Sequence, residues 1–159
     1  MGFKKEQKQR NKHVVKCMKD FGFTNIKEDN NGWVIYPELL EVKEIELFAK
    51  NEILSQNSIE VGRGLNNFWT YGVTYCTGGC GGSGSASIFG EKCKSKEEAI
   101  IKAFSKLIEY HLYQKKRCEG DGLGNYNEAY SIKIRNEALK KIKNLTNETN
   151  EQNGVDSRV

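Results

Sequence analysis

The chain has 159 residues, 37% of them apolar, and its 25 lysine and arginine side chains against 21 aspartate and glutamate give a net charge of +4. This length favours one domain, and the absence of an apolar run of about 18 residues argues against a membrane-spanning helix. Because the N-terminal residues MGFKKEQKQRNKHVV lack the apolar segment of a signal peptide, we expect a cytoplasmic protein with no membrane partner.

The first predicted element is an amphipathic helix over residues 4–20. Its N-terminal half is almost wholly polar and basic, and Gly22 is placed to end it. A short hairpin follows, with strands over 24–28 and 33–36 and a turn over 29–32. The apolar side of the helix consists of Val14, Val15, Cys17, Met18 and Phe21.

After Pro37 the pattern changes again. The apolar spacing over residues 38–56 predicts a second helix, and residues 59–62 are expected to form a strand. The positions that indicate this helix are Leu40, Ile45, Leu47, Phe48, Ile53 and Leu54.

Residues 68–75 carry the clearest strand pattern. Aromatic and β-branched side chains alternate with small polar ones, which is typical of a strand buried on one face. Five glycines between Gly78 and Gly84 then predict a long hairpin loop, with a return strand beginning at residues 87–89. The face expected to be buried consists of Trp69, Tyr71, Val73 and Tyr75.

A capping box at Ser95 and Glu98 begins a predicted helix over residues 95–114. Its apolar stripe should cover the aromatic strand face, and another helix is predicted over residues 127–145. We therefore expect an α+β domain over residues 1–145, with a single antiparallel sheet (sheet core 59–90) packed against helices, and a disordered tail over 146–159. The stripe consists of Ile100, Ala103, Phe104, Leu107, Ile108 and His111.

The cysteines and glycines provide weak chemical motifs. Cys76, Cys80 and Cys93, with Cys118 or His111 as a fourth ligand, are zinc candidates, but the spacing lacks a repeated C-x2-C pair. Unliganded thiols and a disulfide from Cys76 to Cys80 or Cys93 are the alternatives. The glycines at 79, 81 and 84 match G-x-G-x-x-G, but ten residues separate them from the next helix, which argues against phosphate binding at its N-terminus. We expect no cofactor.

Basic side chains gather at both ends of the helix predicted over 95–114. Lysines at a helix N-terminus meet the positive end of the dipole, which favours a negatively charged partner. Glu91, Glu97 and Glu98 offset part of this charge, so an ordinary solvated surface is the alternative. The candidate binding residues from the strand, the loop and these clusters are Trp69, Tyr71, Gly79, Gly81, Gly82, Ser83, Lys92, Lys94, Lys96, Lys115, Lys116 and Arg117.

Residues 91–111, EKCKSKEEAIIKAFSKLIEYH, follow the strands. Residues 66–112 thereby resemble the end of a double-stranded-RNA-binding domain. The resemblance implies that Lys94 and Lys96 contact phosphates across a groove of the RNA.

The whole chain is similar in style to small phage and mobile-element proteins such as anti-CRISPR inhibitors. The shared features are a short chain, a compact α+β pattern, an aromatic hairpin, a glycine-rich loop and no recognisable catalytic set. The resemblance implies a non-enzymatic protein that inhibits a host protein or ribonucleoprotein by surface occlusion, which is our leading hypothesis. An RNA- or DNA-binding module acting through lysines and aromatics is the alternative, and a small zinc-dependent or nucleotide-handling enzyme is the third.

Overall fold

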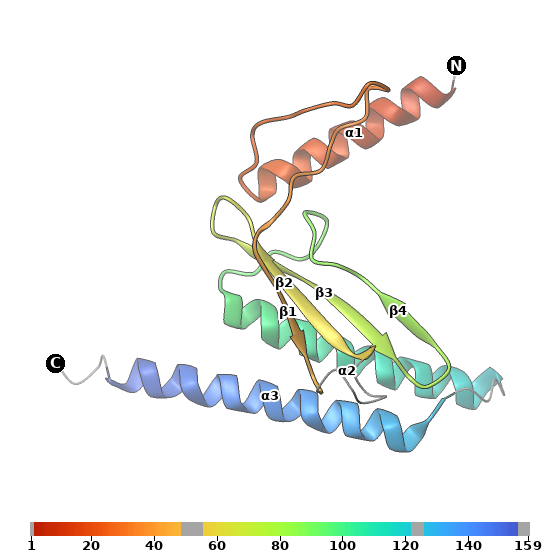
Figure 1. Ribbon diagram of the computed structural model, residues 1–159, viewed down its shortest axis with the longest axis vertical. Helices are drawn as coiled ribbons and strands as arrows, with labels where there is room; N and C mark the ends of the chain where they lie inside the picture. The colour runs from red at the N-terminus through yellow and green to blue at the C-terminus, as the bar shows by residue number, and fades with distance from the viewer. Residues whose placement is uncertain (1, 49–55, 122–125, 156–159) are drawn as a thin grey trace.

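The computed structural model describes residues 2–48, 56–121 and 126–155 as an N-terminal helix, a four-stranded sheet and two C-terminal helices (Figure 1). The strands are antiparallel, in the order β1-β2-β3-β4. This arrangement confirms the predicted α+β fold with one antiparallel sheet. The elements are α1 Gly2–Asp20, β1 Leu40–Glu46, β2 Ser58–Arg63, β3 Trp69–Cys76, β4 Gly81–Ser83, α2 Lys96–Asp121 and α3 Glu128–Val155.

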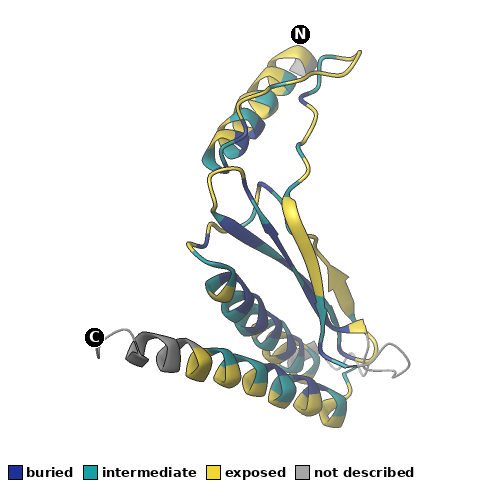
Figure 2. Cartoon of the chain, turned by 60° about the vertical axis from the view of Figure 1, so that its left-hand side comes forward, coloured by how far each residue is buried: buried dark blue, intermediate teal, exposed yellow. Residues whose placement is uncertain are grey.

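The main hydrophobic core lies between the sheet and α2. Trp69 and Val73 of β3 belong to one buried cluster with Ala103, Phe104 and Leu107 of α2. The aromatic strand face and the helix stripe therefore meet as the sequence predicts. Figure 2 shows the inner strands buried, while β1 and β4 are exposed at the two edges of the sheet.

The helix α3 packs against α2. Ile134 and Ala138 are fully buried and belong to the main core. The helix predicted over 127–145 is thus confirmed, but residues 146–155, predicted as a disordered tail, continue it to Val155. Extending a helix whose first turns are packed costs far less than starting one, which explains why a polar sequence remains helical. The last residues of the predicted tail, 156–159, lie outside the described residues.

The helix α1 has a hydrophobic cluster of its own at one end of the sheet (Figure 1). Val14 and Met18 are buried in it. The hairpin predicted at 24–36 contributes to the same cluster, although its pairing is reduced to one bridge between Glu28 and Val34. The other buried members are Phe21, Phe23, Val34 and Ile88.

The prediction of a helix over 38–56 is wrong where the structure describes it. Residues 40–46 form β1, with Ile45 opposite Ile59 of β2. A bulge interrupts the pairing after Leu40, and Glu41 has a φ of 50°. The apolar spacing of so short a segment fits a helix or a strand. Residues 40–46 form a strand because they pair with the free edge of β2. Residues 49–55 of the predicted helix lie outside the described residues.

The return strand is β4, not residues 87–89. Ser83 pairs with Thr74, whereas residues 87–90 form a turn in which the Gly90 N–H donates to the Ser87 carbonyl. The backbone of β3 and that of the segment after β4 approach each other closely at Gly72. A Cβ atom added to Gly72 would lie only 2.0 Å from the Gly84 carbonyl oxygen. The glycines therefore allow the chain to pack against β3, and much of the predicted loop is ordered by that packing.

Candidate nucleic-acid interface

Five lysines lie on one face of α1. Successive members are three or four residues apart, and an α-helix turns about 100° per residue, so all five fall within a narrow band. All five are exposed, while Val14 and Met18 on the opposite side are buried. We call this set the lysine face; it consists of Lys5, Lys8, Lys12, Lys16 and Lys19.

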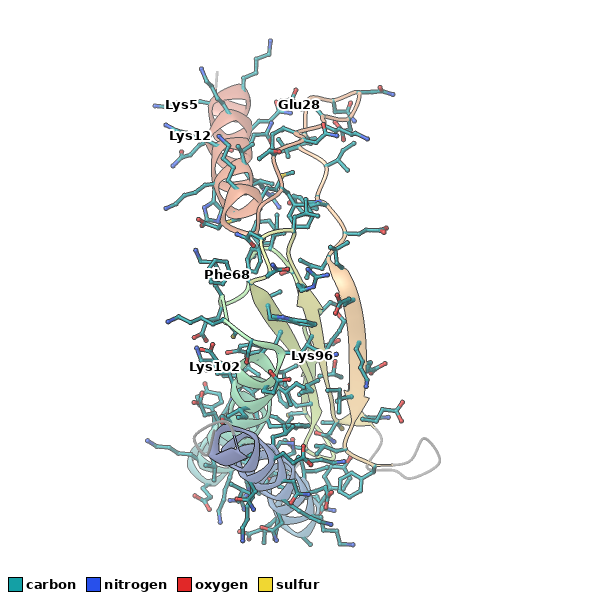
Figure 3. All side chains as sticks on the ribbon, turned by 90° about the vertical axis from the view of Figure 1, so that its left-hand side faces the viewer. Lys5, Lys12, Glu28, Phe68, Lys96 and Lys102 are labelled. Atoms are coloured by element: carbon teal, nitrogen blue, oxygen red, sulfur yellow. The ribbon has the colours of Figure 1, made fainter. Side chains whose placement is uncertain are left out.

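No described residue forms an ion pair with the lysine face. The ion pairs of the described residues involve other cations, such as Lys102 with Glu91 and Lys106 with Glu109. Figure 3 shows Lys5 and Lys12 projecting to one side of α1 and Glu28 on the other. The charge of the lysine face is therefore not neutralised within the described structure.

Hydrogen bonds fix the rotation of α1 about its axis. The Gln7 amide donates to the Asn31 carbonyl and the Asn11 amide to the Gly32 carbonyl, both at 2.7 Å. Asn11 Oδ1 also accepts the Val34 N–H at 3.3 Å. With Val14 buried below, these contacts hold the lysine face toward solvent before any partner binds.

The lysines predicted before α2 extend this positive region only in part. Lys92 lies next to the end of α1, where its Nζ is 3.6 Å from Asp20 and 5.4 Å from the centre of the Phe68 ring. Lys96 Nζ lies 5.2 Å from the centre of the Trp69 ring. Lys94 is exposed. Lys92 therefore joins the lysine face to the start of α2.

The predicted cluster of Lys115, Lys116 and Arg117 lies toward the C-terminal end of α2, away from α1 (Figure 1). The Lys115 ammonium donates to the Glu128 carboxylate, and this hydrogen bond raises the pKa of Lys115. Part of the cluster thus links α2 to α3, and the structure does not bring it together with the lysine face.

The aromatic strand supplies fewer contact residues than predicted. Trp69 is only 8% exposed and belongs to the core, so little of its side chain is accessible to a partner. Gly79 and Gly81 are exposed near the tip of the β3–β4 hairpin. Tyr71 is half-buried and lies with Gly82 and Ser83 around a different feature, a groove beside β3.

We call this feature the tyrosine groove. It has a volume of about 470 Å³ and lies between β3, the segment after β4, and α2. Burial, reinforced by the hydrogen bond from the Tyr71 hydroxyl to Glu91 (3.0 Å), raises the pKa of Tyr71 to about 12, so this phenol stays protonated. The lining residues used below are Tyr71, Tyr75, Gly82, Ser83, Phe89, Lys106 and Tyr110.

The zinc candidates are not assembled into a site. All five cysteines are free thiols, and the described residues contain no group of three or more His, Cys, Asp or Glu side chains placed to hold a metal ion. Cys93 is fully buried in the main core, and this burial raises the pKa of its thiol to about 11. The alternative disulfides from Cys76 to Cys80 or Cys93 are not formed, and Cys76, Cys80, Cys93 and Cys118 are not gathered into a metal-binding group.

A polar network is buried where α2 and α3 meet the sheet. His111 Nδ1 lies 2.9 Å from Ser131 Oγ, and His111 Nε2 lies 2.9 Å from Asn57 Oδ1. A serine, a histidine and an amide in this order resemble a catalytic triad. All three side chains are 0% exposed, however, so a substrate has no access to them. We call Asn57, His111 and Ser131 the buried histidine network.

Comparison of the chain with protein-family models, with curated proteins and with solved structures found no match. Each helix in the described ranges is too polar over its length to serve as a membrane span. The lysine face was not among the predicted binding residues. The signal was present in the sequence, as lysines recurring every three or four residues over 5–19.

Proposed function

We propose that the protein binds nucleic acid through the lysine face, with α1 lying along a phosphate backbone. The observation that carries this proposal is the set of five exposed lysines that no described carboxylate neutralises. Lysine ammonium groups bind phosphates and release condensed counterions, which supplies most of the affinity of a sequence-independent interaction.

The dimensions of the lysine face suit such a partner. From Lys5 to Lys19 an α-helix rises about 21 Å, the length of about six base pairs of duplex. Lys92 extends the same positive region toward α2, and Lys94 and Lys96 remain the phosphate contacts implied by the resemblance to a double-stranded-RNA-binding domain. The rigid attachment of α1 reduces the entropy that binding would otherwise cost.

The test is the triple variant Lys8→Gln, Lys12→Gln and Lys16→Gln. Its affinity for a labelled RNA or DNA of about twenty nucleotides should fall by roughly 10- to 100-fold, and the slope of log K against log salt should become shallower by about two to three. Fluorescence anisotropy at several salt concentrations measures both quantities.

A matched control removes three exposed lysines from α3, with Lys133→Gln, Lys140→Gln and Lys143→Gln. It changes the net charge equally and should retain most of the affinity. An equal loss in both variants would mean that only the total charge matters, and binding that is insensitive to salt would contradict the proposal.

A protein partner is the second candidate, favoured by an exposed apolar patch. Tyr36 and Val42 are 50% and 52% exposed, and the Tyr36 ring packs edge-on against Phe89, 5.2 Å between centroids. These side chains border a second groove of about 430 Å³. We call Tyr36, Val42 and Phe89 the apolar patch. Exposed apolar groups of this kind mark interaction surfaces, as an inhibitor acting by surface occlusion requires.

This second candidate predicts a protein that the wild type retains from nuclease-treated host lysate. The variant Val42→Glu should lose it, because a carboxylate on the apolar patch would have to be desolvated. Leu139→Glu is the control, since Leu139 is equally exposed at 54% but lies on α3. Retention by both variants, or loss of the protein on nuclease treatment, would argue against the apolar patch.

A further inference from the structure

Backbone pairing along one edge of β3 has a gap that opens into the tyrosine groove. The N–H and C=O of Trp69 both bond to Cys93, at 2.9 and 2.8 Å, and the Val73 carbonyl accepts the Gly84 N–H at 3.0 Å. Residues two apart in an antiparallel strand direct these groups to the same side. The N–H and C=O of Tyr71 therefore face this edge too, where no described residue hydrogen-bonds to them.

The gap arises because the chain leaves β3 between these two points. Between the bond at Gly84 and the bridge at Cys93 the chain passes over Gly72, and the Ala86 N–H donates to Glu60 Oε1 of β2 at 2.8 Å. Backbone groups screened from water are nearly always paired in folded proteins. The Tyr71 N–H and C=O are thus left to water or to a ligand in the tyrosine groove, next to Gly90, on which a Cβ atom would lie 3.4 Å from the Tyr71 carbonyl oxygen. The available edge is one residue long, which is too short for an added peptide strand but suits a small flat group.

Aromatic rings form the walls of the same space. Tyr75 and Tyr110 stack with their ring centroids 4.8 Å apart, and Phe89 is 45% exposed on the other side. Gly82 adds no side chain that would fill the space. Rings of this kind stack on nucleic-acid bases, with about 1–3 kcal/mol per stacked base in proteins that bind single strands.

The charges at the groove fit the same ligand. Lys106 Nζ lies 5.5 Å from the centre of the Tyr110 ring and pairs at the surface with Glu109. The carboxylate of Glu91 is bound by Lys102 at 2.6 Å and by the Tyr71 hydroxyl. The one carboxylate among the lining residues is therefore compensated, and Lys106, which shares its charge with Glu109 at the surface, lines the groove beside the Tyr110 ring.

We propose that the tyrosine groove binds one unpaired base of the nucleic acid whose backbone lies on the lysine face. The base hydrogen-bonds through adjacent donor and acceptor atoms to the Tyr71 backbone and stacks on the tyrosine pair. This inference rests on the proposed function, and it specifies the target as a single strand or an RNA with an unpaired loop. Unpaired bases expose their Watson–Crick edges and ring faces, which pairing and stacking cover in a duplex.

Amide chemical shifts of the ¹⁵N-labelled protein test this assignment directly. A single-stranded RNA of about twelve nucleotides should shift the amides of Tyr71, Gly82 and Gly84 together with those of α1. The duplex of the same sequence should shift α1 alone. Shifts at Tyr71 with adenosine monophosphate but not with the strand would assign the groove to a free nucleotide and overturn the proposal.

The variant Tyr110→Leu tests the stacking contribution. It should weaken binding of the single strand about tenfold and leave duplex affinity unchanged. Tyr113→Leu is the matched control, because Tyr113 is 60% exposed one turn further along α2 and does not line the groove. If Tyr110→Leu fails to fold, the chemical-shift experiment on the wild type still tests whether the tyrosine groove binds a base.

The two proposals fail in different ways. Loss of RNA and DNA binding altogether, with no shifts in α1, would overturn the proposed function. Equal affinity for single strand and duplex, with shifts in α1 but none at Tyr71, would overturn only the assignment of the groove.

Discussion

Replacing Asn57 with alanine is expected to lower the free energy of unfolding by about 3 kcal/mol, because several buried or half-buried partners lose their hydrogen bonds at once. Asn57 Oδ1 accepts the Cys76 N–H at 3.0 Å and faces His111 Nε2, while its Nδ2 donates to the Cys76 carbonyl and the Tyr130 hydroxyl, both at 3.3 Å. Water cannot replace these contacts readily, since the side chain is 0% exposed.

The same bonds determine the protonation of His111. Because the Cys76 N–H can only donate, Asn57 Oδ1 is an acceptor, and His111 Nε2 must carry the proton that it donates to this oxygen. His111 Nδ1 then accepts from the Ser131 hydroxyl. Removing Asn57 thus disturbs β3, α2 and α3 together, and the loss is larger than that of one hydrogen bond.

Urea unfolding monitored by circular dichroism measures this effect. Asn30→Ala is the control, since Asn30 is exposed in the turn before Trp33 and should change stability by less than about 0.5 kcal/mol. A similar small change for Asn57→Ala would mean that the buried histidine network contributes little to the fold.

Acidification is expected to destabilise the protein through His111. Burial, followed by the nearby charge of Arg135, lowers the pKa of His111 from 6.5 to about 4 in the folded state. Below about pH 6.5 the unfolded chain binds a proton that the folded chain does not accept until about pH 4. The contribution is therefore complete above pH 6.5 and is lost on descending to pH 4, about 3 kcal/mol in total.

The measurement is the free energy of unfolding of the wild type and of His111→Gln between pH 4 and pH 8. The wild type should lose up to about 1.4 kcal/mol more per pH unit than the variant between pH 6.5 and 4. Above pH 7 the two curves should run parallel, which provides the internal control. Parallel curves at every pH would show that His111 takes up its proton equally in both states.

Local sequence signals predicted the elements that depend on them. The Ser95 hydroxyl accepts the Glu98 N–H at 3.1 Å, as a capping box requires, although the Glu98 carboxylate accepts the Lys94 N–H instead of the predicted Ser95 amide. The alternation along β3 and the helical spacing of α2 likewise predicted which faces meet. Each of these patterns depends only on residues within one helix or strand, so packing against other elements does not change it.

The errors came from pairing between distant segments. β1 is a strand because Ile45 lies opposite Ile59, and β4 is a strand because glycines let its backbone approach β3. Neither partner can be identified from the spacing within the segment itself. Residues 40–46 therefore looked helical, and Gly81–Ser83 looked like an open loop.

The candidate site was predicted in part. Tyr71, Gly82 and Ser83 line the tyrosine groove, and Lys92 continues the lysine face, but the aromatic alternation alone did not separate the buried Trp69 from the half-buried Tyr71. The lysine face of α1 could have been recognised from the sequence, because lysines three or four residues apart lie on one side of a helix. The gap in pairing at Tyr71 was beyond prediction, since it depends on where the chain departs from β3.

The net positive charge of the chain is concentrated on α1. Seven basic and two acidic side chains give this helix a net charge of +5, which exceeds the +4 of the whole chain, so the remaining residues carry −1. Because α1 lies at one end of the molecule, this charge of +5 is concentrated at that end (Figure 1). In the field of a polyanion the protein should rotate before contact and arrive with α1 leading, which raises the association rate at low salt.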